Sequence, residues 1–384
     1  MTGLPLEDIT VIGIEQAVAA PLATRQLADL GARVIKIERP EGGDFARKYD
    51  NVVHGESSVF VWLNRGKESV ELDLTSEAGQ AVIHELLSRA DVVVANLAPR
   101  ALASLGLTTE QLCVRHPNLI VCTISGYDPD GPTPDKKAYD ALIQAETGLM
   151  SLTGMPSQPA KVGISVADIA AGSFAYSGVL AALRHRDRTG EALPVHVSLF
   201  GALTEWMAYP LYYTTYGGTA PEPMGTAHPT IAPYGAVRTA DGGSVMVAVQ
   251  NDREWTRLCR NVIERPDLVD DLRFSSNSER VANRADLDQE LAVAFAALTE
   301  RALITRLEEA QIAWSTLNGV AELARHQELD TPKRWLDTDT PGGQVRTLAP
   351  TATPGGRCAQ TGVVPGYGQH TAAILAEISG RKER

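Results

Sequence analysis

One carboxylate stands out in this sequence, because Asp168 lies among small and apolar residues at the start of a long apolar stretch. The stretch begins as KVGISVADIAAG at residues 161–172 and continues to about Arg184. A helix that is apolar on all sides belongs in a protein interior, so Asp168 is predicted at the head of a buried helix. Backbone N–H groups at a helix start lack partners, so Ser165 or Asp168 could simply cap this helix.

The alternative is that the Asp168 carboxylate acts as a nucleophile. An aspartate has an ordinary pKa of about 3.9, so it is ionised at neutral pH and needs no general base. A carboxylate is a weak nucleophile, and its electrophile must therefore be activated, as the carbonyl of a thioester is. Ser165, the nearest hydroxyl, has no evident base beside it.

The elements that would position Asp168 alternate between strands and helices. An apolar strand at 8–14, a helix at 22–30 and a strand at 34–37 form a βαβ unit, which predicts a parallel sheet. The same alternation continues with strands at 69–74, 92–95, 119–124 and 193–199, and with helices at 75–89 and 138–149. The fold class is therefore α/β.

The pattern changes after residues 217–233, which are rich in Gly, Pro and Thr. A hairpin is predicted at 234–239 and 244–249 around Asp241-Gly242-Gly243. The elements expected beyond it are helices at 252–263, 284–298 and 300–310 with Asn251, Asn283 and Thr299 as caps, short strands after Arg334, and a last helix at 370–378. These elements predict a large domain at 1–215 and 330–384, a small α+β domain at 225–325, and linkers at 216–224 and 326–329.

Composition narrows the class of protein. The chain has 384 residues with 44% hydrophobic and 21% charged residues, which is ordinary for a soluble globular protein. A net charge of −12 argues against nucleic acid or an anionic membrane as partner. No stretch is expected to span a membrane, and no signal peptide is evident. Four widely spaced cysteines fit reduced thiols and a cytoplasmic location.

Known site motifs are largely missing from the sequence. No GxGxxG, P-loop or GxSxG is present, and the scattered histidines lack metal-ligand spacing, so no metal site is expected.

Three separated segments resemble one family. They are EQAVAAPLATRQLADLGARVIKIERP, VGISVADIAAG and GTAHPTIAPYG. They resemble the class III coenzyme A transferases and occur in the order found in that family, which includes formyl-CoA and carnitinyl-CoA transferases and a divergent branch of acyl-CoA racemases. The resemblance implies a Rossmann-like large domain, a smaller α+β domain and an interlocked homodimer. It also implies that Asp168 forms a mixed anhydride and then an aspartyl-CoA thioester, with no permanently bound cofactor and with acyl-CoA and a carboxylic acid as substrates.

The resemblance also implies which residues bind CoA. Arg39 and Lys137 would hold its phosphates, although Arg39 could instead form a surface ion pair with Glu38 or Glu41. The other expected contacts are Leu72, Asn96 and Leu97 around the nucleotide, the backbone of Val18 and Ala19 at the thioester, and Arg100 in place of an arginine that the family often has where this chain has Ser104. Leu72 could equally belong to the core.

The expected substrate pocket is formed by Tyr49, Phe60, Tyr139, Asp140 and His228. Racemases have a histidine where this chain has Tyr139, and tyrosine, with a pKa of about 10, is poorly suited to moving a proton at neutral pH. His228 could act as a base, but a lone histidine between Ala227 and Pro229 is more often structural.

Three hypotheses remain: a CoA transferase, a 2-methylacyl-CoA racemase and a CoA-ester binding protein without turnover. AHPTIAPYG and AETGLMSLTG resemble relatives that use short dicarboxylic acids such as mesaconate, itaconate or succinate.

Overall fold

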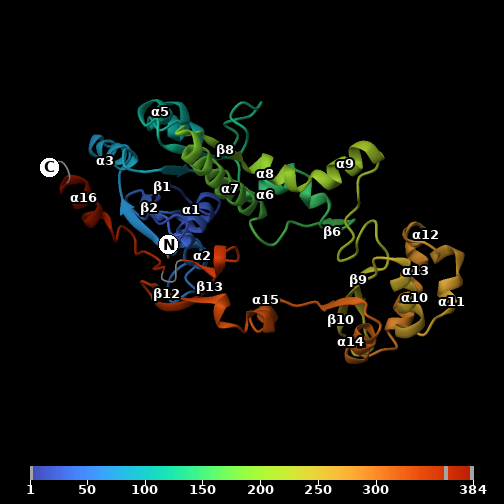
Figure 1. Cartoon of the computed structure of the whole chain (residues 1–384). Helices are drawn as coiled ribbons and strands as arrows, with labels where there is room; N and C mark the ends of the chain where they lie inside the picture. The colour runs from blue at the N-terminus through green and yellow to red at the C-terminus, as the bar shows by residue number, and fades with distance from the viewer. Residues whose placement is uncertain (1–2, 359–361, 381–384) are drawn as a thin grey trace. The chain divides into compact units, whose positions relative to one another are not determined.

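A computed structural model describes residues 3–358 and 362–380 of the chain (Figure 1). The chain divides into two compact units. The larger unit contains residues 1–147, 162–209 and 331–384, and the smaller contains 148–161 and 210–330. Residues 148–161, expected in the large domain, belong to the smaller unit because Gly225 N–H donates to Gly154 O at 2.7 Å.

The larger unit is built on a six-stranded sheet with the order β3-β2-β1-β4-β5-β8. All five strand pairs are parallel. The strands are β1 (Thr10–Ile14), β2 (Arg33–Glu38), β3 (Lys67–Glu71), β4 (Val92–Ala95), β5 (Ile120–Ser125) and β8 (Val195–Ser198). Every strand predicted for this half is present, and the α/β class is confirmed.

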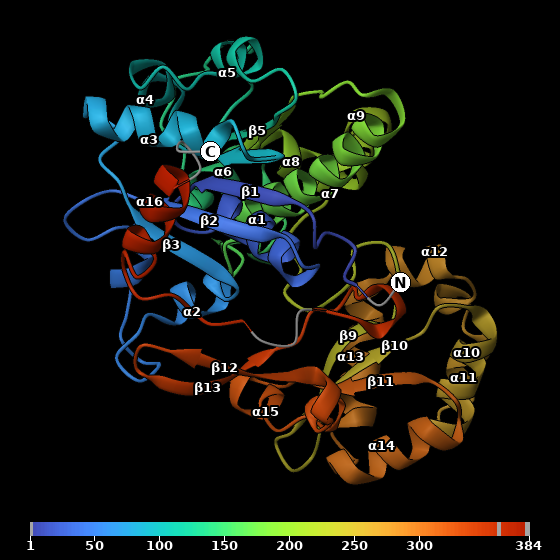
Figure 2. The same ribbon diagram turned by 60° about the vertical axis from the view of Figure 1, so that its left-hand side comes forward.

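Two faces of this sheet are covered by different helices. An apolar core lies between the strands and α3 (Glu77–Leu87), α4 (Pro99–Ser104), α5 (Thr109–Arg115) and α16 (Thr371–Gly380). Helices α1 (Ala19–Asp29) and α7 (Val166–Thr189) pack together side by side (Figure 1, Figure 2). The remaining elements of the unit are η1 (Phe45–Lys48), α2 (Ser58–Asn64), α6 (Asp140–Glu146), α8 (Leu199–Trp206) and the hairpin of β12 (Trp335–Thr340) with β13 (Gly343–Leu348).

Several predicted boundaries differ from the structure for local reasons. The strand expected to reach Leu74 ends at Glu71, because Asp73 accepts hydrogen bonds from the N–H and hydroxyl of Thr75 and turns the chain. Helix α3 then begins at Glu77 behind Ser76, whose hydroxyl accepts from Gly79 N–H. Helix α6 ends at Glu146, and Gly148 follows in the left-handed region with a φ of 79°.

The smaller unit has its own apolar core around Trp255, Phe274 and Phe295. Its antiparallel sheet has the order β11-β10-β9, with α13 and α14 packed on it (Figure 2). The predicted hairpin is confirmed as β9 and β10. The elements are β6 (Gly154–Met155), β7 (Gln158–Pro159), β9 (Tyr234–Arg238), β10 (Ser244–Ala248), α10 (Asp252–Arg257), α11 (Asp267–Asp270), α12 (Asn277–Ala282), α13 (Arg284–Phe295), α14 (Glu300–Glu309), β11 (Ala313–Thr316) and α15 (Val320–Leu323). Helix α9 (Ala208–Gly217) lies at the division between the units.

Two of the three predicted caps in this unit are confirmed. Asn251 accepts from Glu254 N–H, and Thr299 accepts from Ala302 N–H. The prediction for Asn283 is wrong, because its side-chain amide donates to the carbonyls of Arg273 and Glu279 instead.

The expectation that no stretch could span a membrane needs a correction. Helix α7 has 24 residues and a mean hydropathy of 1.5 over its most apolar window, so it is long and apolar enough. Of that window, 44% is buried inside the protein. Core helices of soluble proteins meet the same criterion, so this one helix is weak evidence for a membrane protein.

Candidate active site

Asp168 lies in the first turn of α7, as predicted, but it does not cap the helix. Ser165 occupies the cap position without a side-chain hydrogen bond to the helix. The cap comes from another helix, since Asp140 Oδ1 accepts from Ala167 N–H at 2.8 Å. The Asp168 carboxylate is half-buried and, within residues 3–358 and 362–380, it accepts no hydrogen bond. Its oxygens are therefore available for chemistry.

The electrostatics of Asp168 differ from the expectation. Its pKa is raised to about 7, first by burial and second by the negative charge of Asp140. Asp168 is therefore only about half ionised in the free enzyme at pH 7, and not fully ionised as an ordinary aspartate would be. An ionised carboxylate that is incompletely solvated is a stronger nucleophile than the same group in water.

Close packing of α7 on α1 brings Asp168 to the turn that follows β1. A Cβ on Gly172 would lie 2.5 Å from Ala19 O, so only glycine permits this approach. Ile169, the residue after Asp168, packs on the buried cluster of Val18, Leu22 and Leu63. The N–H groups of Val18 and Ala19 open helix α1, and they donate to no acceptor among the described residues. They are thus free to donate to a ligand.

The turn that precedes α1 is held by side chains from the segments that follow β2 and β4. Ala17 has a φ of 60°, a conformation that costs a non-glycine residue about 1–3 kcal/mol. Its N–H donates to Asp44 Oδ1 at 2.9 Å, and Asn96 bonds both the N–H and the carbonyl of Gln16 at 2.8 Å. Asn96, expected at the nucleotide, therefore uses its amide to fix this turn.

Behind the turn lies a buried charge network. Lys36 Nζ lies 2.7 Å from Asp44 Oδ2 and 3.3 Å from Glu15 Oε1, and Lys67 Nζ lies 2.7 Å from the same Glu15 oxygen. These four side chains are fully buried. The opposite charges compensate one another, and removing one partner would leave an unpaired buried charge. The network anchors Asp44 and, through it, Ala17.

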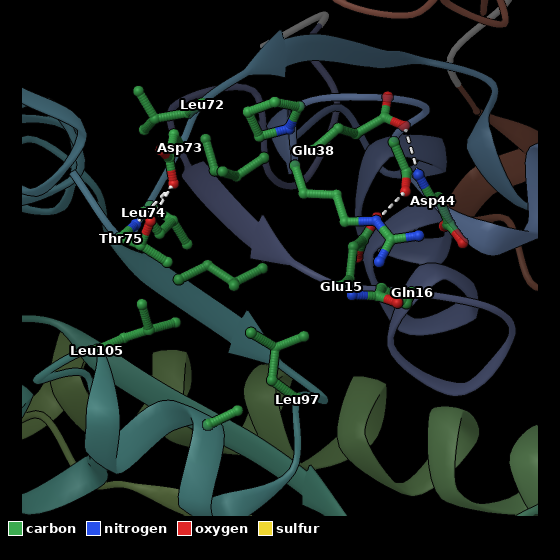
Figure 3. Close-up of a pocket in the computed structure, with 16 residues that line it drawn as sticks. Glu15, Gln16, Glu38, Asp44, Leu72, Asp73, Leu74, Thr75, Leu97 and Leu105 are labelled. Atoms are coloured by element: carbon green, nitrogen blue, oxygen red, sulfur yellow. Dashed lines mark hydrogen bonds between the residues drawn. The ribbon is translucent and has the colours of Figure 1, made fainter.

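A cavity of about 280 Å³ opens where β1 to β4 end, the edge at which parallel sheets bind ligands. Leucine side chains form one part of its wall and acidic or polar side chains another (Figure 3). The leucines include Leu72, Leu74, Leu97 and Leu105, and the polar residues include Glu15, Gln16, Glu38, Arg39 and Asp44. Three of the residues expected to bind CoA, Leu72, Leu97 and Arg39, thus line one cavity.

The basic residues expected to hold CoA are dispersed. The Arg39 guanidinium lies 4.4 Å from the centre of the Phe45 ring and donates to Gly43 O. The alternative of an Arg39 ion pair with Glu38 is not found, because Glu38 pairs with Arg47 at 2.7 Å. Lys137 is exposed and has no ion pair to the described part of the chain.

Arg100 is not placed to replace the missing arginine in the first cavity. Its guanidinium is 83% exposed and lies 3.0 Å from Asp135. Arg100 lines a second cavity of about 460 Å³, to which Leu97 also contributes. Ser104 donates its hydroxyl to Ala101 O within its own helix.

The expected substrate-pocket residues separate into three environments. Tyr49 and Tyr139 are both exposed. The pKa of Tyr49 is raised, first by partial burial and then by the charges of Asp44, Asp168 and Tyr139, which indicates that Tyr49 lies near these groups. Phe60 is fully buried, and the Arg47 guanidinium carbon lies 3.8 Å from the centre of its ring. Phe60 therefore supports the site from below and presents no surface to a substrate. His228 lies in the smaller unit.

The environment of His228 is that of a structural residue. Its ring stacks on Tyr234, and its Nδ1 accepts from Thr230 N–H at 3.2 Å. Its backbone carbonyl accepts from Arg284 at 2.7 Å. These contacts hold the loop in which it lies.

Other reactive groups are poor candidates for nucleophile or metal ligand. All four cysteines are free thiols, and burial raises the pKa of Cys122 and Cys259 to about 12, so neither is a thiolate at neutral pH. Within residues 3–358 and 362–380, no group of three or more His, Cys, Asp or Glu side chains could hold a metal ion.

Comparison with known proteins identifies the family. The family described as CoA-transferase family III matches residues 6–371. The chain belongs to this class III CoA-transferase family. It is 34% identical to the succinate–glutarate CoA-transferase of Agrobacterium fabrum, over 97% of this chain and 96% of that protein. The succinyl-CoA:mesaconate CoA-transferase of Haloarcula hispanica is 32% identical over 97% and 96% of the two chains.

Solved structures agree with the sequence comparison. A CAIB/BAIF family protein from Brucella suis superposes with a TM-score of 0.85 and 32% identity, covering 98% of this chain and 100% of that one. The chain is therefore a CoA-transferase that moves CoA from an acyl-CoA to a carboxylic acid.

Proposed function

We propose that this CoA-transferase moves CoA between short dicarboxylic acids by covalent catalysis on Asp168. The observation that carries the proposal is the Asp168 carboxylate, which is half-buried and free of hydrogen bonds to the described residues. The next residue, Ile169, packs on the cluster that contains Val18, where the N–H groups of Val18 and Ala19 are open. The reaction needs no resident cofactor, because the thioester itself is the activated group.

The first half-reaction transfers CoA to the enzyme. Asp168 Oδ attacks the acyl carbon, the C–O bond forms, the C–S bond breaks, and CoA leaves as a thiolate. The thiolate then attacks Cγ of Asp168, which releases the donor acid and leaves an aspartyl-CoA thioester. The N–H groups of Val18 and Ala19 would stabilise the oxyanion of the tetrahedral intermediate.

The second half-reaction returns CoA to the acceptor. The carboxylate of the acceptor acid attacks Cγ of Asp168 and displaces the CoA thiolate, which gives a new mixed anhydride. The thiolate attacks the acceptor acyl carbon, and Asp168 leaves as a carboxylate. Each step replaces one acyl bond with another, so no oxidant, reductant or metal is required.

Dicarboxylic acids are proposed as substrates from the relatives, which are named for succinate, glutarate and mesaconate. Incubation of the enzyme with succinyl-CoA and a panel of free acids, followed by mass spectrometry of the CoA esters, tests the proposal. We expect new CoA esters of short dicarboxylic acids. Transfer only to monocarboxylic acids would contradict the substrate class, and α-proton exchange without transfer would instead favour the racemase.

Phosphate binding by Arg39 and Lys137 gives a prediction for CoA affinity. Hydrogen bonds to charged groups are worth about 1.5–3 kcal/mol, so each alanine variant should bind CoA about 10- to 150-fold more weakly. Isothermal titration with CoA measures the effect. Lys136→Ala is the matched control, because Lys136 is already paired with Glu146 at 2.6 Å and should bind CoA normally. Unchanged affinity in both Arg39→Ala and Lys137→Ala would refute the assignment.

We also propose that the enzyme is a homodimer. Exposed aromatic side chains support this, since Trp206, Tyr212 and Tyr216 on α8 and α9 are 49%, 59% and 86% exposed. Aromatic surface of this kind is typical of protein interfaces. Light scattering at micromolar concentration should give twice the chain mass, and an active monomer would exclude an obligate dimer.

Free thiols and CoA-ester substrates favour the cytoplasm as the location. Cell fractionation would check it, and enzyme found outside the cell would refute it.

A further inference from the structure

Gln144 is a buried glutamine that joins two parts of the active site. Its side chain is fully inaccessible to solvent. It lies on α6, four residues after Asp140. Nε2 donates to Asp140 Oδ2 at 2.8 Å and to Ile164 O at 3.3 Å, and Oε1 accepts from Val162 N–H at 2.8 Å.

The orientation of this amide is fixed by its partners. Val162 N–H can only donate, so it must face the amide oxygen. The Asp140 carboxylate and the Ile164 carbonyl can only accept, so they must face the amide nitrogen. A buried amide with three such partners has one favourable orientation, and removing it would take one hydrogen bond from each of them.

The contacts of Gln144 lead directly to Asp168. Asp140 uses one oxygen to accept from Gln144 and the other to accept from Ala167 N–H, one residue before Asp168. Val162 and Ile164 belong to the segment that leads into α7. Gln144 therefore touches both the cap of the nucleophile's helix and the segment that delivers the chain to it.

We propose that Gln144 is a positioning residue that holds Asp168 in its reactive geometry through Asp140 and the segment 162–164. The proposal rests on the assignment of Asp168 as nucleophile, and it adds a residue that does not itself meet the substrate.

Gln144→Leu tests the proposal, because leucine keeps similar bulk and removes all three hydrogen bonds. A reacting atom displaced by about 1 Å can cost about 100-fold in rate, so we expect kcat to fall about 10- to 100-fold. The KM for the acyl-CoA should change less than about threefold, since the CoA cavity is untouched. A residue that serves only stability would lower the melting temperature and leave kcat per folded enzyme unchanged.

Gln26→Leu is the matched control. It makes the same substitution on α1 at a glutamine whose buried amide oxygen has no hydrogen-bond partner among the described residues. This variant should keep wild-type kcat and KM.

A double-mutant cycle shows whether Gln144 acts through Asp140. If it does, Gln144→Leu should lower kcat by a smaller factor in the Asp140→Ala background than in the wild type, because only its contacts with the segment 162–164 are then left to lose. Additive losses in kcat would overturn the route through Asp140. If Gln144→Leu does not fold, Gln144→Glu takes its place at pH 8.5, since an ionised glutamate accepts from Val162 N–H but cannot donate to Asp140.

Hydrogen exchange gives a readout independent of turnover. Peptides covering residues 161–170 should exchange faster in Gln144→Leu than in Gln26→Leu. Val162 N–H loses the Gln144 oxygen, and Asp140, the acceptor of Ala167 N–H, loses the Gln144 amide that holds it. Equal exchange, or unchanged kcat in an active enzyme, would overturn the positioning role. If the wild type shows no transferase activity while Gln144→Leu still exchanges faster than Gln26→Leu, the proposed function is refuted instead.

Discussion

Asp168→Ala is expected to abolish CoA transfer, with kcat lowered by about 10⁴-fold or more, because covalent catalysis has no substitute for its nucleophile. Within the segment 161–172 the nearest oxygen nucleophile is Ser165, a hydroxyl without a base. Binding of CoA, measured by titration, should remain within about threefold of the wild type, since the cavity at the ends of β1 to β4 does not include this residue.

The stability of Asp168→Ala separates the nucleophile from a capping residue. A lost cap costs about 0.5–2 kcal/mol of unfolding free energy. Asp140 supplies the cap here, and ionised Asp168 is disfavoured by burial, so the variant should melt no lower than the wild type at pH 8. Asp187→Ala, at the exposed far end of the same helix, is the control and should retain activity. Substantial transfer by Asp168→Ala would contradict the mechanism.

The second large effect concerns pH. Because the pKa of Asp168 is raised to about 7 and only the ionised form attacks, kcat/KM for the acyl-CoA should fall about tenfold per pH unit below pH 7. The charged group that faces Asp168 is Asp140 on α6, and Tyr49 lies close enough to interact with the Asp168 charge. The pKa of Tyr49 is raised, so Tyr49 stays neutral through this range, and we expect the acid limb to report Asp168.

Asp140→Asn distinguishes this titration from that of the CoA phosphate. The asparagine keeps an oxygen for Ala167 N–H and removes the negative charge, so the acid limb should move to lower pH. Part of the shift should remain, because burial is the larger cause of the raised pKa. An acid limb at the same pH in wild type and Asp140→Asn would show that Asp168 does not set the profile.

The same pKa sets the pH dependence of stability. The folded-state pKa of Asp168 lies above the unfolded value of about 3.9, so the folded protein binds the proton more tightly. Wild-type stability should therefore decrease as pH rises from about 4 to about 7, relative to a variant without this carboxyl. This sign is opposite to that of a carboxylate stabilised by a salt bridge.

Local patterns in the sequence predicted the elements that carry the site. Short apolar runs gave the strands of the parallel sheet, and the small residues after Asp168 predicted a closely packed helix, which Gly172 confirms. The boundary after Glu71 was missed because Asp73 redirects the backbone through its own side chain. The alternation of apolar and polar residues alone does not reveal such a turn.

Contacts between distant residues could not be predicted from local patterns. Asp140 and Ala167 are 27 positions apart, and no spacing rule connects an aspartate on one helix to the cap of another. Lys36, in the middle of the apolar run VIKIE, was a usable signal, because a lysine in a buried strand requires a buried counter-charge. Its partners Glu15 and Asp44 could be assigned only from the structure.

The raised pKa of Asp168 also depends on tertiary structure. The sequence placed a carboxylate at a helix start, where the dipole favours the ionised form. The structure adds burial and a second carboxylate, and these two effects raise the pKa of Asp168 to about 7. Reference pKa values therefore predicted the wrong protonation state for the residue that the sequence singled out.

Covalent trapping tests the central claim most directly. The enzyme is incubated with an acyl-CoA and hydroxylamine, digested, and analysed by peptide mass spectrometry. Attack of hydroxylamine on the anhydride or thioester at Cγ should leave a hydroxamate on Asp168, and Asp168→Ala should carry none. A hydroxamate on Asp140, or an active enzyme that is never labelled, would contradict the assignment of Asp168 as the nucleophile.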